Sequence, residues 1–214
     1  MKKRLLYFFL LAILLMAGCS EQEEPSTVLA AEEANEVPAY YKGYVANPQV
    51  TADALLQEEG QAIRDDKGEL VVNEVTMDSQ VHKIGPVEIT IREAKNLHYK
   101  PAYSLVDFYH SYTHDTEFDL VKFFVEIKNT SGEPLHFAPV ALLETSSGEK
   151  KLWEDDVYLE ELNGEMAAGE TKSGNLGFLV EEADFEFLTI TTSDVFAEGT
   201  EKIADAKTVD IRFR

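Results

Sequence analysis

The feature that most constrains the fold of this chain is a series of short segments in which apolar and polar residues alternate. The clearest is Val121–Lys128, whose residues 121, 123, 125 and 127 are apolar and would share one face. Residues 122, 126 and 128 are charged and would face the other way, with Phe124 as the exception. A period of two is typical of a half-buried β-strand. Similar patterns occur at Val87–Ile91, Leu176–Val180, Phe185–Thr192 and Val209–Phe213.

Turn-forming residues separate these segments. Asn129–Gly132 follows the clearest strand, and Pro139 interrupts another apolar stretch, which predicts an edge or bulged strand there. Little of the chain has a helical period. One short helix is expected at Thr51–Glu59, with Thr51 as its N-cap and Gly60 just after its end. Many short strands joined by polar turns predict an all-β sandwich.

The N-terminus has the pattern of an export signal. Basic residues at Met1–Arg4 precede an apolar run, Leu5–Met16, that is shorter than a membrane-spanning helix. Ala17-Gly18-Cys19 then resembles a bacterial lipobox, although Met16 stands where leucine is more usual. We therefore expect residues 1–18 to be a lipoprotein signal peptide and Cys19 to be lipidated. The alternative is an uncleaved signal anchor.

Lipidation at Cys19 would place the protein on the extracytoplasmic side of a cell membrane. Two acyl chains provide stable attachment to a bilayer. Cys19 is the only cysteine, so the chain forms no internal disulfide and its core alone must hold the domain together.

The net charge restricts the classes of partner that the protein can bind. The formal net charge is −21, and removal of residues 1–18 would take away three basic residues and no acid. Such a charge argues against binding to nucleic acid or to anionic lipid through the folded domain.

Residues 19–38 are acidic and broken by proline, which predicts a flexible tether. Residues 39–80 form an extension with the short helix and a strand. Its tyrosines either pack on the domain or stay exposed.

The order of motifs from residue 81 to 214 resembles a known family. A GPVEITI strand, FFVEIKNTSGEPL, a segment ending in ETSSGEK and then AAGETKSGNLGFLV follow one another. Their sequence resembles an Ig-like domain family of unknown function from surface lipoproteins of Gram-positive bacteria. The resemblance implies an Ig-like β-sandwich and carries no catalytic residues. The insertion between Lys100 and Phe118 is longer than the family pattern.

This insertion holds the candidate metal ligands. His110 and His114 are four residues apart, a spacing that brings two imidazoles to one face of a helix, and Asp107 and Asp115 could complete a set of nitrogen and oxygen ligands. In a loop the four-residue spacing does not bring the two imidazoles to one face. The sequence indicates no other cofactor. The alternative is a loop that contacts a partner or covers one end of the sandwich.

Tyr109 and Tyr112 are the candidate partner-binding residues of the same loop. A lone tryptophan in a small β-domain is expected in the core, so Trp153 is predicted to be buried. The other possibility is an exposed aromatic on an acidic edge, as in carbohydrate-binding platforms.

No nucleophile elbow and no glycine-rich phosphate loop occurs, so the sequence favours a protein that is not an enzyme. We expect an Ig-like module, anchored to the bilayer through acylated Cys19, that binds an unknown protein or envelope polymer through loops at one end of the sandwich. The alternative is a metal-binding or metal-sensing lipoprotein that uses His110 and His114.

Overall fold

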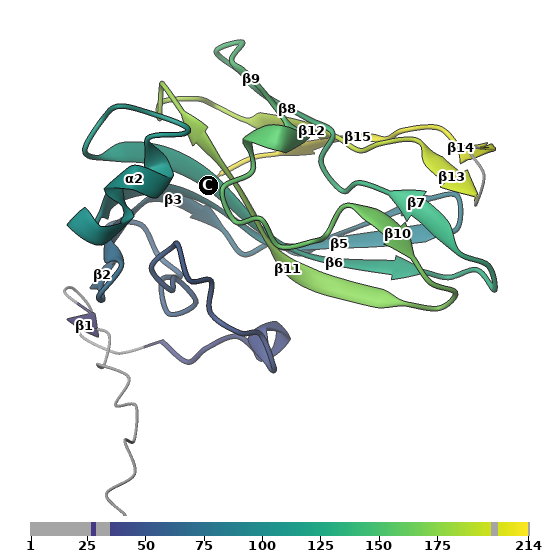
Figure 1. Ribbon diagram of the computed structural model, residues 1–214, viewed down its shortest axis with the longest axis horizontal. Coiled ribbons are helices and arrows are strands. Elements are labelled where there is room, and N and C mark those ends of the chain that lie inside the picture. Colours follow the sequence, from purple (N-terminus) through teal and green to yellow (C-terminus); the bar gives the residue numbers. More distant parts are fainter. Residues whose placement is uncertain (1–26, 29–34, 198–200, 214) are drawn as a thin grey trace, which may run out of the picture.

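The computed structural model describes residues 27–28, 35–197 and 201–213 (Figure 1). The expected signal peptide and the lipidation site at Cys19 lie outside these residues.

A large antiparallel sheet forms the first layer of the domain. Its strand order is β1-β2-β3-β5-β6-β11, and β4 pairs with β5 beside this path. The long central strands are the ones whose alternation is clearest in the sequence. The bounds are β1 Thr27–Val28, β2 Ala62–Arg64, β3 Gly68–Thr76, β4 Gln80–Ile84, β5 Val87–Pro101, β6 Phe118–Asn129 and β11 Thr171–Val180.

The second layer consists of two four-stranded sheets, ordered β10-β7-β13-β14 and β15-β12-β8-β9. Hydrogen bonds from Ala141 N to Thr191 O and from Ser193 N to Ala138 O link them where their strands break. Pro139 interrupts the strand as expected, because it lies between β7 and β8, but neither strand is at a sheet edge: β7 lies between β10 and β13, and β8 between β12 and β9. The bounds are β7 Leu135–Phe137, β8 Leu142–Thr145, β9 Lys150–Leu152, β10 Gly164–Met166, β12 Leu188–Thr191, β13 Val195–Ala197, β14 Lys202–Ala204 and β15 Thr208–Ile211.

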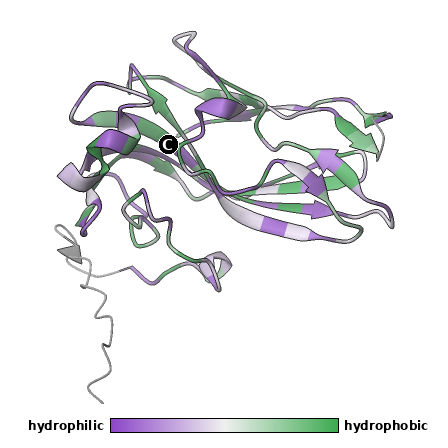
Figure 2. Cartoon of the chain, in the orientation of Figure 1, coloured by the Kyte–Doolittle hydropathy of each residue, from purple (hydrophilic) through white to green (hydrophobic). Residues whose placement is uncertain are grey.

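The main core lies between the two layers, and the all-β sandwich expected from the sequence is confirmed (Figure 1). Hydrophobic and hydrophilic stretches succeed one another along the strands in Figure 2. The predicted inward face of β6 is correct, because all four of its apolar residues are buried in this core. These residues are Val121, Phe123, Val125 and Ile127.

A second core covers the outer face of the large sheet. It is built by the N-terminal strap, defined here as residues 35–61, together with β2 and the short helices beside it. Leu56 of the strap is fully buried. Phe124, the exception to the alternation of β6, packs against strap tyrosines, and its ring centroid is 4.4 Å from that of Tyr41. The remaining short elements are η1 Ala39–Tyr41, η2 Tyr103–Leu105, α2 Val106–Tyr109 and η3 Trp153–Asp155.

Two expectations for the N-terminal part need correction. Residues 51–59 form turns and no helix, because side chains of the segment bond to distant residues: Thr51 Oγ1 donates to Asp65 Oδ1 at 2.8 Å. A helix of this length is marginal on its own, so such contacts override its propensity. The proposed tether also extends less far than residue 38. Asn35 Nδ2 already donates to the main-chain oxygen of Leu55 at 3.2 Å.

Candidate functional site

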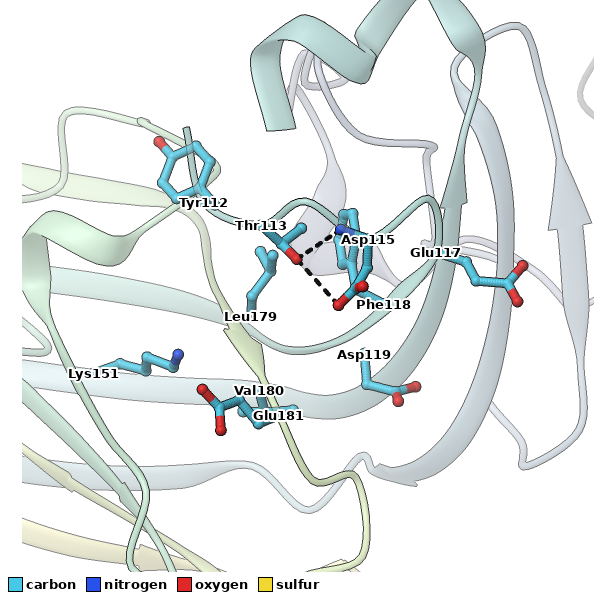
Figure 3. A pocket seen from close by; sticks show the side chains of 10 residues that line it. All are labelled: Tyr112, Thr113, Asp115, Glu117, Phe118, Asp119, Lys151, Leu179, Val180 and Glu181. Carbon is cyan, nitrogen blue, oxygen red and sulfur yellow. Dashed lines mark hydrogen bonds between the residues drawn. The ribbon is translucent and has the colours of Figure 1, made fainter. Parts of the chain in front are cut away.

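An acidic groove lies under the insertion at one end of the sandwich, with a cavity volume of about 430 Å³ (Figure 3). It lies between the loop that follows α2, the start of β6, the end of β11 and β9. Its lining residues are Tyr112, Thr113, Asp115, Glu117, Phe118, Asp119, Lys151, Leu179, Val180 and Glu181. Four carboxylates and one lysine therefore surround an open space about as large as a small-ligand site.

Aromatic packing holds the insertion in place. Tyr109, at the end of α2, is 1% exposed, and its ring centroid is 4.9 Å from that of Phe118 and 5.6 Å from that of Tyr99. Its hydroxyl donates to the main-chain oxygen of Gln49 in the strap at 2.9 Å. Burial of such a ring stabilises the fold by roughly 1.5–3 kcal/mol, so the roof of the groove is attached to the second core.

This geometry corrects half of the partner-binding prediction. Tyr109 cannot contact a partner, because its side chain is enclosed by the second core. Tyr112 is half-buried and lines the groove, as a contact residue would. Burial raises the pKa of Tyr112, and the carboxylates of Asp156 and Asp155 raise it further, so this hydroxyl stays a hydrogen-bond donor at neutral pH.

The charges of the groove differ in how strongly they are held. Asp119 Oδ1 lies 3.0 Å from His98 Nδ1 and accepts from Asn73 Nδ2 at 3.0 Å, which fixes this carboxylate. Asp115 Oδ2 accepts only a long bond from Thr113 Oγ1, 3.3 Å. The carboxylate of Glu181 has no side-chain partner among the described residues. Glu117 Oε2 is paired with Lys100 Nζ at 3.2 Å. The negative charge that no cation of the described chain neutralises therefore belongs to Asp115 and Glu181.

The predicted metal ligands are not assembled into a site. The rings of His110 and His114 lie 5.9 Å apart between centroids, and both residues are exposed, as are Asp107 and Asp115. In the part of the chain that the structure describes, no group of three or more His, Cys, Asp or Glu side chains is placed to hold a metal ion. The physical reason is that α2 ends at Tyr109. The segment from His110 to His114 is therefore outside the helix, and the four-residue spacing does not place the two imidazoles on one helix face. The metal hypothesis stays a prediction.

Sequence reasoning missed a buried ion cluster formed by Asp53, Glu93, Lys95 and Lys122. Lys122 Nζ lies 2.9 Å from Asp53 Oδ2 and 2.5 Å from Glu93 Oε1. Lys95 Nζ lies 2.7 Å and 3.0 Å from the same two oxygens. Both lysine side chains are 0% exposed, so two ammonium groups and two carboxylates neutralise one another out of contact with bulk solvent.

The cluster joins the strap to the large sheet. Asp53 comes from the strap, whereas Glu93 and Lys95 come from β5 and Lys122 from β6. Burial alone would raise the pKa of Asp53, but the two ammonium groups outweigh this effect and hold that pKa below its ordinary value. The same balance lowers the pKa of Glu93. Asp53, Glu93 and Lys122, whose own pKa the two carboxylates raise, are therefore charged at neutral pH.

Tyrosines of the strap complete the cluster. Tyr41 Oη donates to Glu93 Oε1 at 2.7 Å and accepts a bond from Lys122 Nζ. Tyr40 Oη donates to Glu93 Oε2 at 2.5 Å. The only sequence signal for this arrangement was the apolar Phe124 on the face of β6 that should have been polar.

Trp153 also departs from expectation, because 50% of its surface is exposed. It belongs to η3, a single turn at the surface after β9, so the prediction of a core tryptophan is wrong. Within the described residues no helix has the length and apolar character needed to span a membrane.

Comparison with known proteins shows a family without an assigned activity. No family profile matches the chain. The uncharacterized protein YdhF of Bacillus subtilis (strain 168) is 44% identical over 186 residues, which cover 79% of this chain and 79% of YdhF.

Among solved structures, a functionally unknown protein from Listeria monocytogenes EGD-e has a TM-score of 0.54 at 14% identity, covering 69% of this chain and 89% of that chain. This likeness shows a shared fold. The ycdA protein of Bacillus subtilis subsp. subtilis str. 168 has a TM-score of only 0.39 at 20% identity, covering 64% of this chain and 39% of its own. No argument rests on this second likeness.

Proposed function

The chain belongs to the family of Bacillus subtilis YdhF, and from this premise we propose that it is a membrane-anchored extracytoplasmic lipoprotein whose Ig-like module binds a positively charged partner without catalysing a reaction. The antiparallel sandwich supports the Ig-like assignment. The lipobox-like Ala17-Gly18-Cys19 supports the anchor, and the resemblance to Gram-positive surface lipoproteins agrees with it.

One observation carries the binding proposal: the groove at the end of the sandwich has four carboxylates and a single lysine around about 430 Å³. Lys151 is itself paired, with its Nζ 2.9 Å from Glu149 Oε1. A basic segment of a protein or an envelope polymer complements this charge. Because the groove is open to solvent, each ion pair contributes only about 0.2–1 kcal/mol, so the interaction is modest and salt-dependent.

A labelled pentalysine peptide tests the groove. Fluorescence polarisation would measure its affinity for the wild type and for a variant carrying Asp115→Asn and Glu181→Gln. Loss of two exposed ion pairs is expected to weaken binding about 2- to 30-fold at low salt. Raising the salt concentration should reduce the difference between the two proteins.

The matched control is a variant with Glu133→Gln and Glu165→Gln. These exposed carboxylates lie near β7 and β10, at the end of the sandwich away from α2, and the control loses the same charge (Figure 1). Equal weakening in both variants would mean that the peptide responds only to overall charge, and the groove would lose its assigned role.

The anchor is tested separately by Cys19→Ala in the producing cell. The wild type is expected to take up radioactive fatty acid and to have the mass of a chain that begins at an acylated Cys19, whereas the variant should take up no label. A wild-type chain that keeps residues 1–18 and takes up no fatty acid would show a signal anchor, and the lipoprotein assignment would fail.

A further inference from the structure

A second surface pocket, separate from the acidic groove, surrounds the exposed tryptophan. Its volume is about 240 Å³, and its lining residues are Trp153, Glu154, Asp156, Leu159, Glu160, Glu161, Leu162, Asn163 and Leu176. None of these nine residues lines the acidic groove. The size suits a ligand of one ring, since sites for drug-sized molecules begin at about 300 Å³.

The tryptophan is held at the surface by its surroundings. Asp155 Oδ2 accepts from the main-chain nitrogen of Leu152 at 2.8 Å, which fixes the turn that carries Trp153. Asp156 Oδ1 accepts from Gly177 N at 2.8 Å and ties the end of the same turn to β11. The turn that presents the exposed ring is therefore held in place at both ends. Leaving such a ring half in water forgoes part of the roughly 1.5–3 kcal/mol that full burial would provide.

One residue that lines the pocket has a strained backbone. Leu159 has a φ of 55°, and it is the only residue other than glycine with a positive φ among the described residues. Its side chain is 58% exposed, so burial of this leucine does not compensate the strain. A left-handed conformation costs a leucine roughly 1–2 kcal/mol, and such strain concentrates at binding sites.

The polar groups of the pocket that lack partners are hydrogen-bond acceptors. Asn163 Oδ1 is buried and has no hydrogen-bond partner. The exposed carboxylates of Glu154 and Glu161 have no side-chain partner in the described part of the chain, and no Lys, Arg or His lines the pocket. An unpaired buried acceptor costs about 1–3 kcal/mol, which a donor from a ligand would recover.

We propose that the Trp153 pocket binds one ring of a neutral sugar. The flat aromatic ring of Trp153 offers a surface for the apolar C–H face of a pyranose. Leu159 and Leu162 close the sides, and sugar hydroxyls donate to Asn163 Oδ1 and to the two free carboxylates. Hydroxyl donors to ionised acceptors form the stronger class of hydrogen bond. Four carboxylates line the pocket, so a ligand that carries a carboxylate or phosphate should bind more weakly than a neutral sugar.

The experiment uses Trp153 as its own reporter, because it is the only tryptophan of the chain. The purified full chain, in a non-ionic polyoxyethylene detergent, is titrated with methyl glucoside, N-acetylglucosamine, glucuronate and tetramethylammonium while tryptophan emission is recorded. The two neutral sugars are expected to change the emission with Kd values on the order of millimolar, as the binding energy per atom of small ligands allows. Glucuronate should bind at least several-fold more weakly.

Two variants separate binding from folding. Trp153→Leu should abolish saturation-transfer NMR signals from the neutral sugars without lowering the melting temperature, because the ring is half exposed. Glu154→Gln with Glu161→Gln should narrow the difference between glucuronate and methyl glucoside, whereas Glu165→Gln should leave that difference unchanged. Loss of a carboxylate that does not line the pocket would not produce this change in selectivity.

Three results would overturn the proposal. The first is the absence of any fluorescence or NMR response to the neutral sugars at 50 mM, a limit set on the order of ten times the expected Kd. The second is tighter binding of tetramethylammonium than of either neutral sugar, which would identify an organic-cation site. The third is unchanged sugar binding in Trp153→Leu. None of these results bears on the acidic groove, which is tested with its own peptide and variants.

Discussion

Replacing Lys122 with methionine removes one of the two cations from the buried ion cluster while keeping an unbranched side chain of similar length. In the wild type, Lys122 Nζ lies within 2.9 Å of a carboxylate oxygen of Asp53 and within 2.5 Å of one of Glu93. In the variant, Lys95 alone faces both carboxylates, so a dry site that was neutral acquires a net charge of about −1.

The cost follows from the burial. Removing one partner of a buried ion pair costs about 3–5 kcal/mol, because the remaining charge has neither water nor a counter-ion. That is at least about a fifth of the roughly 5–15 kcal/mol by which a domain is stable. At about 2–4 °C per kcal/mol for a chain of this size, the melting temperature should fall by roughly 6–20 °C.

The measurement is guanidinium unfolding at pH 7.5. It is followed by circular dichroism and not by the fluorescence of the half-exposed Trp153. Lys128→Met is the control, since Lys128 lies on the same strand but is exposed. Its effect should stay within about 0.5 kcal/mol. Adding Asp53→Asn to Lys122→Met restores a neutral pair of Lys95 and Glu93. The double variant should therefore be less destabilised than the sum of the single variants, by about 0.5–3 kcal/mol.

The pH dependence gives an independent test. Asp53 and Glu93 have pKa values below their ordinary ones, so their contribution to stability is complete above pH about 4 and is lost as the pH falls through the folded pKa. Without Lys122 one carboxylate can take up a proton at higher pH, so the penalty of Lys122→Met should shrink between pH 8 and pH 5. A penalty below about 1 kcal/mol, or one that does not change with pH, would refute the assignment of a dry, balanced cluster.

Other predictions follow from single contacts. Burial raises the pKa of Asp156 to about 6, so the protonated carboxyl stabilises the fold below pH about 4 and this contribution is lost as the pH rises through 6. The unfolding free energy of Asp156→Asn should therefore increase by about 2 kcal/mol relative to that of the wild type between pH about 4.5 and about 7. Parallel curves of unfolding free energy against pH would contradict this. Gly177→Ala places a Cβ 2.6 Å from the ring of Tyr158 and should cost about 1–3 kcal/mol in urea unfolding, whereas Gly132→Ala, with open space around it, should cost far less. Tyr109→Phe removes only the hydroxyl and should lower the unfolding free energy by about 1 kcal/mol while pentalysine binding stays unchanged; weaker binding would show that the hydroxyl reaches the partner.

The strands and the main core could be predicted from the sequence because their information is local. Alternation along β6 identifies which residues share a face, and Pro139 identifies where a strand of the second layer breaks. A period of two comes from the geometry of an extended chain and needs no knowledge of the neighbouring strands.

The acidic groove and the Trp153 pocket could be predicted only in part. The sequence predicts that the insertion contacts a partner or covers one end of the sandwich, and Tyr112 of this insertion lines the groove. Lys151 and Glu181 join it from distant parts of the chain, and no pattern in the sequence relates them to Tyr112. Trp153 was expected in the core because its residue type favours burial on average, but its place in a surface turn decided otherwise.

What the sequence by itself determined is therefore the β architecture, the inward face of its long strands and the position of the turns. Only the tertiary structure decided what covers the outward face. The alternation of β6 makes Lys122 look like a solvated residue, yet the strap closes over it and Asp53 supplies its counter-ion. The physical reason is that a strand's own pattern distinguishes two sides, whereas burial of the second side depends on a segment 69 residues away in the chain.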